Sequence, residues 1–379
     1  MYRIYADGAI LHNPNFSEEG RVVIDPVLKE KVNTHGSLQF GIAPDHPLYD
    51  KLEPRKTLIK VMSDSANNKP WFGRVVSMSR GWKNVLNVYC EGELACLCDS
   101  LKRPFGFTGT PSDFLSSLIT TYTGSNTDGY AFQLGNVSVT DPNNNIVRSS
   151  SEPMSVWECI ESELVESSLG GYIIPRYDEA NDIHYIDYLV LDENDTYSRT
   201  STQVIEFGKN LLDFTQTWDA SSVMTVIVPY GALKETPVDP PTSGQWDGNR
   251  ITIESVNDGN DYLENSLGIQ MYGRVVGSHT WDDVTLPANL KTKATAWLAQ
   301  QIWQSVTLEI SAVDLAFVNA DIDQIQVGEY VRCRSKMHDL NILLLCTEKE
   351  THLTQLEDSS IILGAGLKTI TDLQGKDVK

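Results

Sequence analysis

The sequence predicts an α+β fold in which β-strands predominate. Short alternating or apolar segments, bounded by turn residues, recur along most of the chain. Three segments with helical periodicity are inserted between them. The strands come in runs and do not alternate one by one with helices, which argues against a parallel βαβ sheet. The 379 residues are 41% hydrophobic and 21% charged, which is typical of a globular protein of two or three domains.

An antiparallel meander is predicted between residues 57 and 90. Residues 57–62 alternate between two faces, and a polar loop at 63–70 turns the chain into a second strand at 71–79. A turn at 80–82 leads to a third strand at 85–90. Connections this short join antiparallel neighbours.

Three helices are predicted from their first residues and their apolar stripes. Thr110 is a suitable N-cap before Pro111, and Ser155 with Glu158 forms a capping box. A third helix follows Pro287, and Gly124 ends the first. The stripes consist of Phe114, Leu115, Leu118, Ile119 and Tyr122, of Trp157, Ile160, Leu164 and Val165, and of Leu290, Ala294, Trp297 and Leu298.

Further short strands are predicted beyond the first helix. They cover residues 184–191, 223–228, 307–313, 325–335, 341–346 and 359–363. Residues 235–248, with Pro237, Pro240 and Pro241, are interpreted as a long exposed loop. The polar tail at 364–379 is expected to fray.

The charge balance argues against one broad class of function. Fifty-one acidic and thirty basic residues give a formal net charge of −21. Nucleic-acid binders neutralise phosphates with lysine and arginine, so a general nucleic-acid-binding protein is disfavoured. No apolar run approaches the ~18 residues of a membrane span, and the first residues lack the apolar core of a signal peptide. We therefore expect a soluble protein made in a cytoplasm.

Neither a metal site nor a disulfide framework is predicted. The six cysteines are scattered, and the pair Cys96 and Cys98 has no second pair or nearby histidine to complete a zinc tetrad. We expect buried free thiols. The acidic segment from Asp258 to Glu264 lacks the order of a calcium loop and is interpreted as a solvated turn. Residues 192–195 are interpreted as a hairpin turn.

No catalytic or cofactor-binding residue is predicted. Phosphate-binding glycine loops, dinucleotide fingerprints, zinc-protease helices and serine-hydrolase elbows are absent from the sequence, and its seven histidines lack ligand spacing. A pair of catalytic carboxylates stays an open alternative, because distance in space defines it. Trp246, in the proline-rich loop, is the candidate exposed contact residue, with local packing of that loop as the alternative.

Several motifs occur in order between about residue 57 and residue 363. They are Trp71-Phe72-Gly73-Arg74-Val75, the segment Cys90 to Ser100, the helix at 156–169 with Gly170-Gly171-Tyr172, Gly208 to Asp213, Thr225 to Pro229 with Gly231-Ala232, Tyr272-Gly273-Arg274 before the helix at 290–297, Val313-Asp314-Leu315, and Asp321 to Val331. Together they resemble the tail-hub family of siphophages and prophages, the N-terminal hub region of tail-associated lysins and prophage endopeptidase tail proteins. Cys96 stands where the family commonly has an aromatic residue.

The resemblance implies a fold similar to the trimeric baseplate hub of contractile phage tails. Such a hub has two barrel-like β domains per subunit, built here from residues 1–100 with about 201–235 and from residues 301–379. An α+β domain at 101–200 and a loop-rich α+β segment at 236–300 complete the expected division. Six near-equivalent barrels in a homotrimer would match a six-fold tail tube to a three-fold tip.

The resemblance also implies partners and a location. The expected partners are a second and third copy, the distal tail protein, the tape-measure protein and receptor-binding or tip proteins. DNA would pass through the lumen without specific binding, and contact with the host cell envelope is conceivable. The expected location is the distal end of the virion tail, after synthesis in the bacterial cytoplasm.

The resemblance does not by itself imply catalysis. Longer relatives carry their peptidoglycan-cleaving module further toward the C-terminus, and this chain ends at Lys379. We therefore expect a structural hub without enzymatic activity, cofactor or metal. The alternatives are a tail-associated peptidoglycan hydrolase and a host-glycan-binding tip module that uses Trp246.

Overall fold

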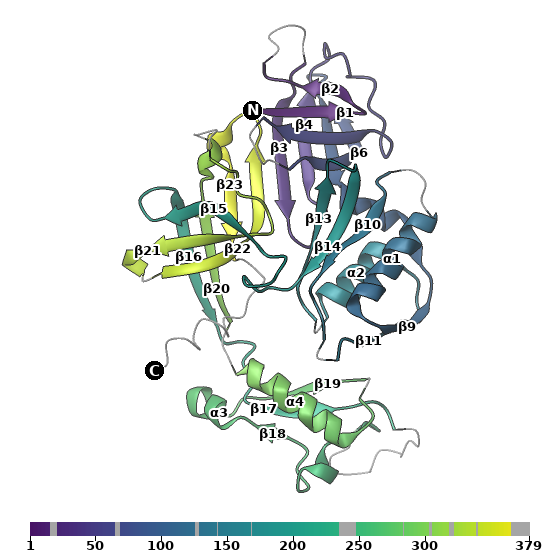
Figure 1. Cartoon of the computed structure of the whole chain (residues 1–379), viewed down its shortest axis with the longest axis vertical. Helices are drawn as coiled ribbons and strands as arrows, with labels where there is room; N and C mark the ends of the chain where they lie inside the picture. The colour runs from purple at the N-terminus through teal and green to yellow at the C-terminus, as the bar shows by residue number, and fades with distance from the viewer. Residues whose placement is uncertain are drawn as a thin grey trace. The chain divides into compact units, whose positions relative to one another are not determined.

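The computed structural model divides into two compact units (Figure 1). It describes residues 1–15, 21–64, 69–125, 129–141, 143–167, 169–234, 248–282, 284–302, 305–317, 322–338 and 340–364. Unit 1 contains Met1–Thr215 and the segment that begins at Leu308, and unit 2 is built around Gln216–Thr307. The candidate site lies within unit 1.

The first β domain is an antiparallel sheet with the strand order β3-β4-β7-β6-β5-β1-β2. Its strands are β1 (Tyr2–Ala6), β2 (Ala9–His12), β3 (Ile24–Lys31), β4 (Ser37–Ile42), β5 (Leu58–Ser63), β6 (Trp71–Arg80) and β7 (Leu86–Gly92). The predicted meander is confirmed, because β5, β6 and β7 pair in sequence order as antiparallel neighbours.

The second β domain continues the same sheet. Its strands are β15 (Arg199–Glu206), β16 (Leu211–Asp219), β20 (Ser305–Ala312), β21 (Glu329–Ser335), β22 (Leu340–His352) and β23 (Ser360–Leu363). The long strand β22 pairs with β21 through its first half and with β3 of the first domain through its second half. One backbone ladder therefore joins the two β domains.

An α+β insertion lies between β7 and β15. It contains η1 (Glu93–Asp99), β8 (Leu101–Lys102), β9 (Phe105–Gly109), α1 (Pro111–Ser125), β10 (Phe132–Val137), β11 (Ile146–Ser150), β12 (Met154–Ser155), α2 (Val156–Ile160), η2 (Glu161–Val165), β13 (Tyr172–Asp178) and β14 (Ile183–Leu189). The sheet β10-β14-β13 packs against the two helices. The predicted capping box is confirmed: Glu158 N donates to Ser155 Oγ at 3.1 Å, and Ser155 N donates to the Glu158 carboxylate at 2.7 Å.

Unit 2 is a small α+β body with its own core. It contains β17 (Val226–Tyr230), η3 (Glu254–Val256), β18 (Leu263–Glu264), α3 (Ser266–Tyr272), β19 (Val276–Thr280) and α4 (Pro287–Gln301). Leu290, Ala294 and Leu298 of α4 are buried against Ile227 and Trp281, so the predicted apolar stripe forms the packed face.

The remaining short elements belong to unit 1 and turn the chain between strands. They are η4 (Leu315–Phe317), η5 (Lys336–His338) and η6 (Leu356–Asp358). Three apolar clusters form the core of unit 1, one in each β domain and one in the insertion. Within the described ranges, none of the helices is long and apolar enough to traverse a lipid bilayer.

The predicted α+β, mainly β class is confirmed, whereas several strands were missed. The strands before residue 43 and the pair β15 and β16 are absent from the predicted segments. β15 reads Arg-Thr-Ser-Thr-Gln-Val-Ile-Glu and has only two buried residues, Gln203 and Ile205. The polar composition of β15 gives no strand pattern in the sequence. The strand is specified by its backbone pairing with β21, and not by an apolar face.

Candidate functional site

Several sequence motifs of unit 1 meet where the two β domains and the insertion adjoin. We call this region of unit 1 the junction. A cleft there is lined by residues of the first β domain (Glu30, Lys69, Trp71), of the insertion (Ile174, Tyr177) and of the second β domain (Gln326, Val327). The junction is the candidate functional site because it brings together residues from three parts of the chain.

Trp71 lies against backbone that carries no side chains. A Cβ added to Gly73 would lie 2.4 Å from the Trp71 ring and 2.4 Å from the carbonyl oxygen of Glu91. A Cβ on Gly92 would lie 1.8 Å from the carbonyl oxygen of His35, and one on Gly36 would meet Trp71 Nε1 at 3.4 Å. The glycines of the Trp-Phe-Gly and Cys-Glu-Gly motifs are therefore needed so that the strands and the indole can approach closely.

Phe72 joins the first β domain to the insertion. Its ring lies 4.7 Å from the ring of His184 and 4.6 Å from that of Tyr177, measured between centroids. Below it, the buried Glu93 carboxylate pairs with His184 Nδ1, and burial raises the pKa of Glu93. A motif residue from each side, Phe72 and Glu93, thus contacts the same buried His184 ring.

Arg74 and Asp99, near the ends of the two motifs, form an ion pair whose arginine side is buried. The Arg74 side chain is 6% exposed and pairs with one Asp99 oxygen, while Arg55 Nη1 donates to the other at 2.8 Å. Burial opposes ionisation of Asp99, but the hydrogen bonds from Arg74 and Arg55 outweigh it and hold its pKa below the usual range. This pair ties η1 to strand β6.

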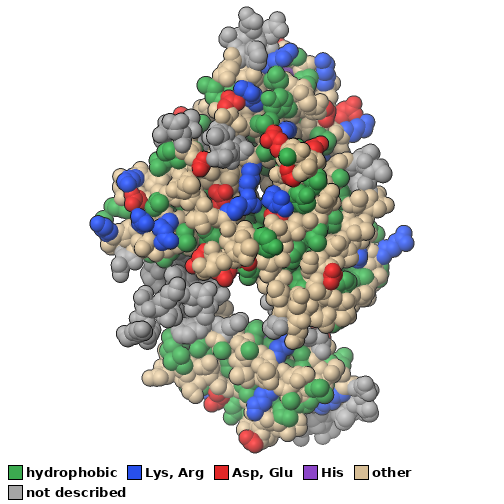
Figure 2. Space-filling view, in the orientation of Figure 1, with side chains coloured by type: hydrophobic (Ala, Val, Ile, Leu, Met, Phe, Trp, Pro, Cys, Tyr) green, Lys and Arg blue, Asp and Glu red, His purple; other side chains and the backbone are tan. Residues whose placement is uncertain are grey.

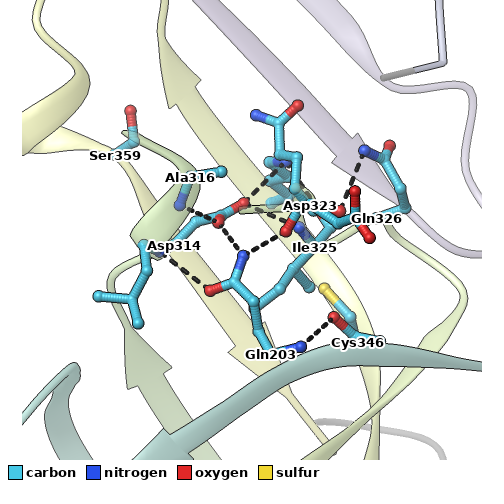
Figure 3. Close-up of polar contacts among 12 residues, drawn as sticks. Gln203, Asp314, Ala316, Asp323, Ile325, Gln326, Cys346 and Ser359 are labelled. Atoms are coloured by element: carbon cyan, nitrogen blue, oxygen red, sulfur yellow. Dashed lines mark hydrogen bonds and ion pairs between the residues drawn. The ribbon is translucent and has the colours of Figure 1, made fainter. Parts of the chain in front are cut away.

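Asp314 is the centre of a second buried network in the junction (Figure 3). Its carboxylate is fully buried and accepts hydrogen bonds from Gln203 Nε2 at 2.5 Å, Ala316 N at 3.0 Å and Ile325 N at 2.9 Å. Lys349 Nζ lies 3.6 Å away and donates to the carbonyl oxygen of Ile325 at 2.7 Å. The buried charge is thus both paired and hydrogen bonded, as a buried carboxylate requires.

Gln203 uses both ends of its amide to hold the same loop. Its Oε1 accepts from Leu315 N at 3.0 Å, and its Nε2 also donates to the carbonyl oxygen of Asp323 at 2.6 Å (Figure 3). Leu315 follows β20 and Asp323 precedes β21, so one side chain of β15 bonds the backbone at two separate points between these strands. The Val313-Asp314-Leu315 and Asp321 to Val331 motifs therefore meet through Gln203.

A small enclosed cavity separates this network from Trp71. It is lined by Tyr2, Glu30, Lys69, Gln324 and Lys349, among others. Gln324 Nε2 donates to the Tyr2 hydroxyl, while the buried Gln324 Oε1 has no hydrogen-bond partner among the described residues. Burial raises the pKa of Glu30 and lowers that of Lys69 to about 8. The junction thus holds several charged groups out of water.

The reactive groups of unit 1 are arranged for packing. Among the described residues, no cluster of three or more His, Cys, Asp or Glu side chains could hold a metal ion. Five of the six cysteines are buried free thiols, and Cys98 is exposed, which corrects the prediction for that residue. Cys98 Sγ lies 3.7 Å from His35 Nε2, and burial raises its pKa to about 11, so it stays protonated at neutral pH.

The predicted contact residue Trp246 lies outside the described residues. Trp82, which sequence reasoning passed over as part of a turn, is fully exposed between β6 and β7. The sequence did contain a signal for this exposure. A tryptophan followed by lysine and asparagine in a tight turn has no neighbouring apolar side chains on which its ring could pack. Trp157 is buried as predicted, and its ring lies 4.5 Å from that of His35 between centroids, tilted by 58°.

The comparisons with known proteins agree with the motif reading. Residues 198–374 match the family model "Prophage endopeptidase tail". This match covers the second β domain and unit 2, and it confirms the predicted resemblance. No curated protein matches the sequence.

Solved structures share the fold along nearly the whole chain. They include prophage tail protein gp18 from Listeria monocytogenes EGD-e (12% identity, 99% of this chain and 97% of that chain, TM-score 0.55). A 43 kDa tail protein of prophage MuSo2 from Shewanella oneidensis is similar (12% identity, 96% of this chain and 97% of that chain, TM-score 0.56). A tail protein from Neisseria meningitidis MC58 is also similar (15% identity, 97% of this chain and 98% of that chain, TM-score 0.57). The chain therefore has the fold of prophage tail proteins from end to end.

Proposed function

We propose that this protein is a structural hub of a phage tail tip. It assembles as a homotrimer, lies at the distal end of the tail, and matches the six-fold tube above to a three-fold tip below. The observation that carries the proposal is the fold likeness to three prophage tail proteins over 96–99% of this chain. Fold alone does not define function, so the junction supplies the second argument.

The motif residues of the junction support an architectural role. Asp314, Gln203 and Arg74 are buried and use their polar atoms on neighbouring parts of the same chain. Trp71 packs on glycine backbone. Residues that serve a substrate reach a surface where the substrate can bind. Arg74 instead ties the first β domain to the insertion, and Asp314 and Gln203 fix the segment after β20 within the second β domain.

The charge of the chain suits a conduit for DNA. Three copies carry a formal charge of −63, three times −21. Carboxylates that face the lumen repel phosphates, so DNA passes during ejection without sticking, and the hub gates this passage. The proposed neighbours are the distal tail protein, the tape-measure protein and receptor-binding or tip proteins.

The mass of the purified protein in solution tests the trimer. Light scattering behind a sizing column is expected to give a species near three times 42.2 kDa. Negative-stain images of that species should show a ring. A monomer at all concentrations and salt levels contradicts self-assembly of the chain. Labelled antibody on isolated tails then tests the location separately, and label along the tube and not at its end contradicts the tip position.

One observation favours peptidoglycan hydrolysis as a second function. Glu30 and Glu93 line the same cleft, and burial raises the pKa of both, which is a property of a general acid in glycoside cleavage. Clearing of purified cell walls by the wild-type protein, lost in Glu30→Gln with the fold intact, would support this function. We propose no catalysis, and therefore expect no clearing by either protein.

A further inference from the structure

Two surface patches of unit 1 have opposite charge and similar apolar content. The first, which we call the cationic patch, consists of Phe207, Lys209, Arg334, Lys336 and Met337. The second, the acidic patch, consists of Leu101, Val147, Glu158, Glu161 and Glu166. Both belong to unit 1, and Figure 1 places β21 on one side of this unit and α2 on the other.

The cationic patch stands out on an acidic protein. Lys209, Arg334 and Lys336 are all exposed, and Figure 2 shows lysine and arginine side chains gathered at the edge where β21 lies. The nearby carboxylate of Glu206 pairs with Lys209. Counted over the described residues named here, three cations and one carboxylate leave a local positive charge on a chain whose net charge is −21.

Two large apolar side chains stand among these cations. Phe207 is 52% exposed and Met337 is 75% exposed. They are neighbours, because Phe207 N donates to the carbonyl oxygen of Arg334 at 3.2 Å and the Phe207 ring lies 5.7 Å from that of His338. Apolar anchors surrounded by cations are typical of a protein interface, whereas a phosphate-binding surface has no need of the anchors.

The acidic patch is complementary in both respects. Glu158 and Glu166 are exposed, and Glu161 lies between them along α2 and η2. Burial, then repulsion from Glu166 and Glu158, raises the pKa of Glu161, so the three carboxylates lie close enough to repel one another. Leu101 is 57% exposed beside the N-cap residue Ser155, and Val147 is 55% exposed next to Arg148, whose Nε donates to the carbonyl oxygen of Glu163.

We infer that the cationic patch of one chain docks on the acidic patch of a second copy. The two patches are different surfaces, so the contact is head to tail, and repetition of such a contact closes a ring when the rotation fits. The inference rests on the proposed homotrimer and names the surfaces that build it. Phe207 and Met337 meet the apolar Leu101 and Val147, while lysine and arginine meet the glutamates.

Charge reversal on each side tests the contact. Arg334→Glu with Lys336→Glu, and separately Glu161→Lys with Glu166→Lys, are each expected to weaken self-association at least about tenfold. The four substitutions in one chain restore opposite charges and should recover the wild-type mass profile. Lys83→Glu and Glu152→Lys, at exposed positions outside both patches, are the matched controls and should assemble normally. Light scattering over a concentration series reads assembly, and circular dichroism verifies folding.

The outcomes separate this inference from the proposed function. If the wild-type protein is a trimer and both charge-reversal variants still form it, the proposed interface is wrong and the proposed hub is unaffected. If both charge-reversal variants lose self-association and the variant with all four substitutions does not recover it, the two patches do not pair with each other. A wild-type monomer overturns the trimer and the interface together. A double-stranded DNA fragment provides one more test. If the wild-type protein binds the fragment, and Arg334→Glu with Lys336→Glu abolishes this binding without changing the mass of the protein, the cationic patch is a nucleic-acid site and the inference is wrong.

Discussion

Gln203 and Asp314 lie 111 residues apart in the sequence, and their side chains form a hydrogen bond of 2.5 Å in the interior of unit 1. Gln203 belongs to strand β15, and Asp314 lies in the loop after β20. The bond closes a network in which the backbone of the same loop and the ammonium group of Lys349 take part. Such a network specifies one arrangement of the loop, because any other leaves a buried charge without partners.

Removal of the Asp314 carboxylate is expected to destabilise unit 1 strongly. Asp314→Ala removes an ion-pair partner of the buried Lys349 ammonium and one of the two acceptors of Gln203 Nε2, which costs about 3–5 kcal/mol of unfolding free energy. Asp314→Asn keeps the shape and some hydrogen bonds and should cost less. Urea denaturation measures both. Asp50→Ala removes an exposed partner of Arg80 and should change the unfolding free energy by less than about 0.5 kcal/mol.

Alanine at Gly92 or Gly73 tests the close approach of Trp71. The added Cβ would lie within 2.4 Å of backbone atoms at either position, so strands β4, β6 and β7 must move apart. We expect a loss of about 1–3 kcal/mol or more in unfolding free energy, together with a shift in tryptophan fluorescence. Gly81→Ala is the matched control, since nothing lies within 4 Å of its Cβ position. Equal stability of all three variants would contradict the packing role.

Local signals in the sequence predicted local structure well. The Ser155 and Glu158 capping box, the N-cap at Thr110 and the apolar stripe of α4 all depend on residues within a few positions of one another. The hydroxyl and carboxylate that satisfy the first free N–H groups of a helix are visible in the sequence itself. The beginnings of the three predicted helices were therefore placed to within a residue, whereas α3 (Ser266–Tyr272) was missed.

The junction could not be predicted from the residues themselves, because its partners are distant in the sequence. Gln324 donates to the hydroxyl of Tyr2, 322 positions away, and Ile173 N donates to Asn33 Oδ1, 140 positions away. The hydrophobic periodicity of a helix or strand gives no information about such long-range contacts. Motif resemblance did point to the residues concerned, since Trp71, Gly73, Gly92 and Asp314 all belong to the motifs, but it did not say what each one contacts.

The cysteines are expected to differ in reactivity. All six lie in the described part of the chain, and only Cys98 is exposed. Iodoacetamide at pH 8 should label Cys98 alone in the folded protein, and slowly, because a pKa of about 11 in place of 9.0 lowers its thiolate fraction about 100-fold. Mass spectrometry should find no label in Cys98→Ser until urea unfolds the chain. Rapid labelling of Cys96 in the folded protein would contradict its burial in the core of the insertion.

Acid is expected to weaken the first β domain through its buried histidines. Burial lowers the pKa of His12 and of His35 to about 4, from an ordinary value of 6.5. Between these values the unfolded chain binds protons that the folded chain does not, so stability falls as the pH falls from about 6.5 to about 4. Glu30 and Glu93 act with the opposite sign, since their raised pKa makes the folded chain bind protons more tightly.

Substitution of His12 isolates one of these contributions. His12 is fully buried, and its Nδ1 accepts from Val23 N at 3.2 Å, which requires the neutral ring. In His12→Asn the amide oxygen can accept the same bond and binds no proton. Urea denaturation at several pH values should therefore show a shallower loss of stability, by about 1.4 kcal/mol per pH unit at most, between pH 6.5 and 4. Parallel curves for the two proteins would show that His12 is protonated in the folded chain, against the burial that the structure gives it.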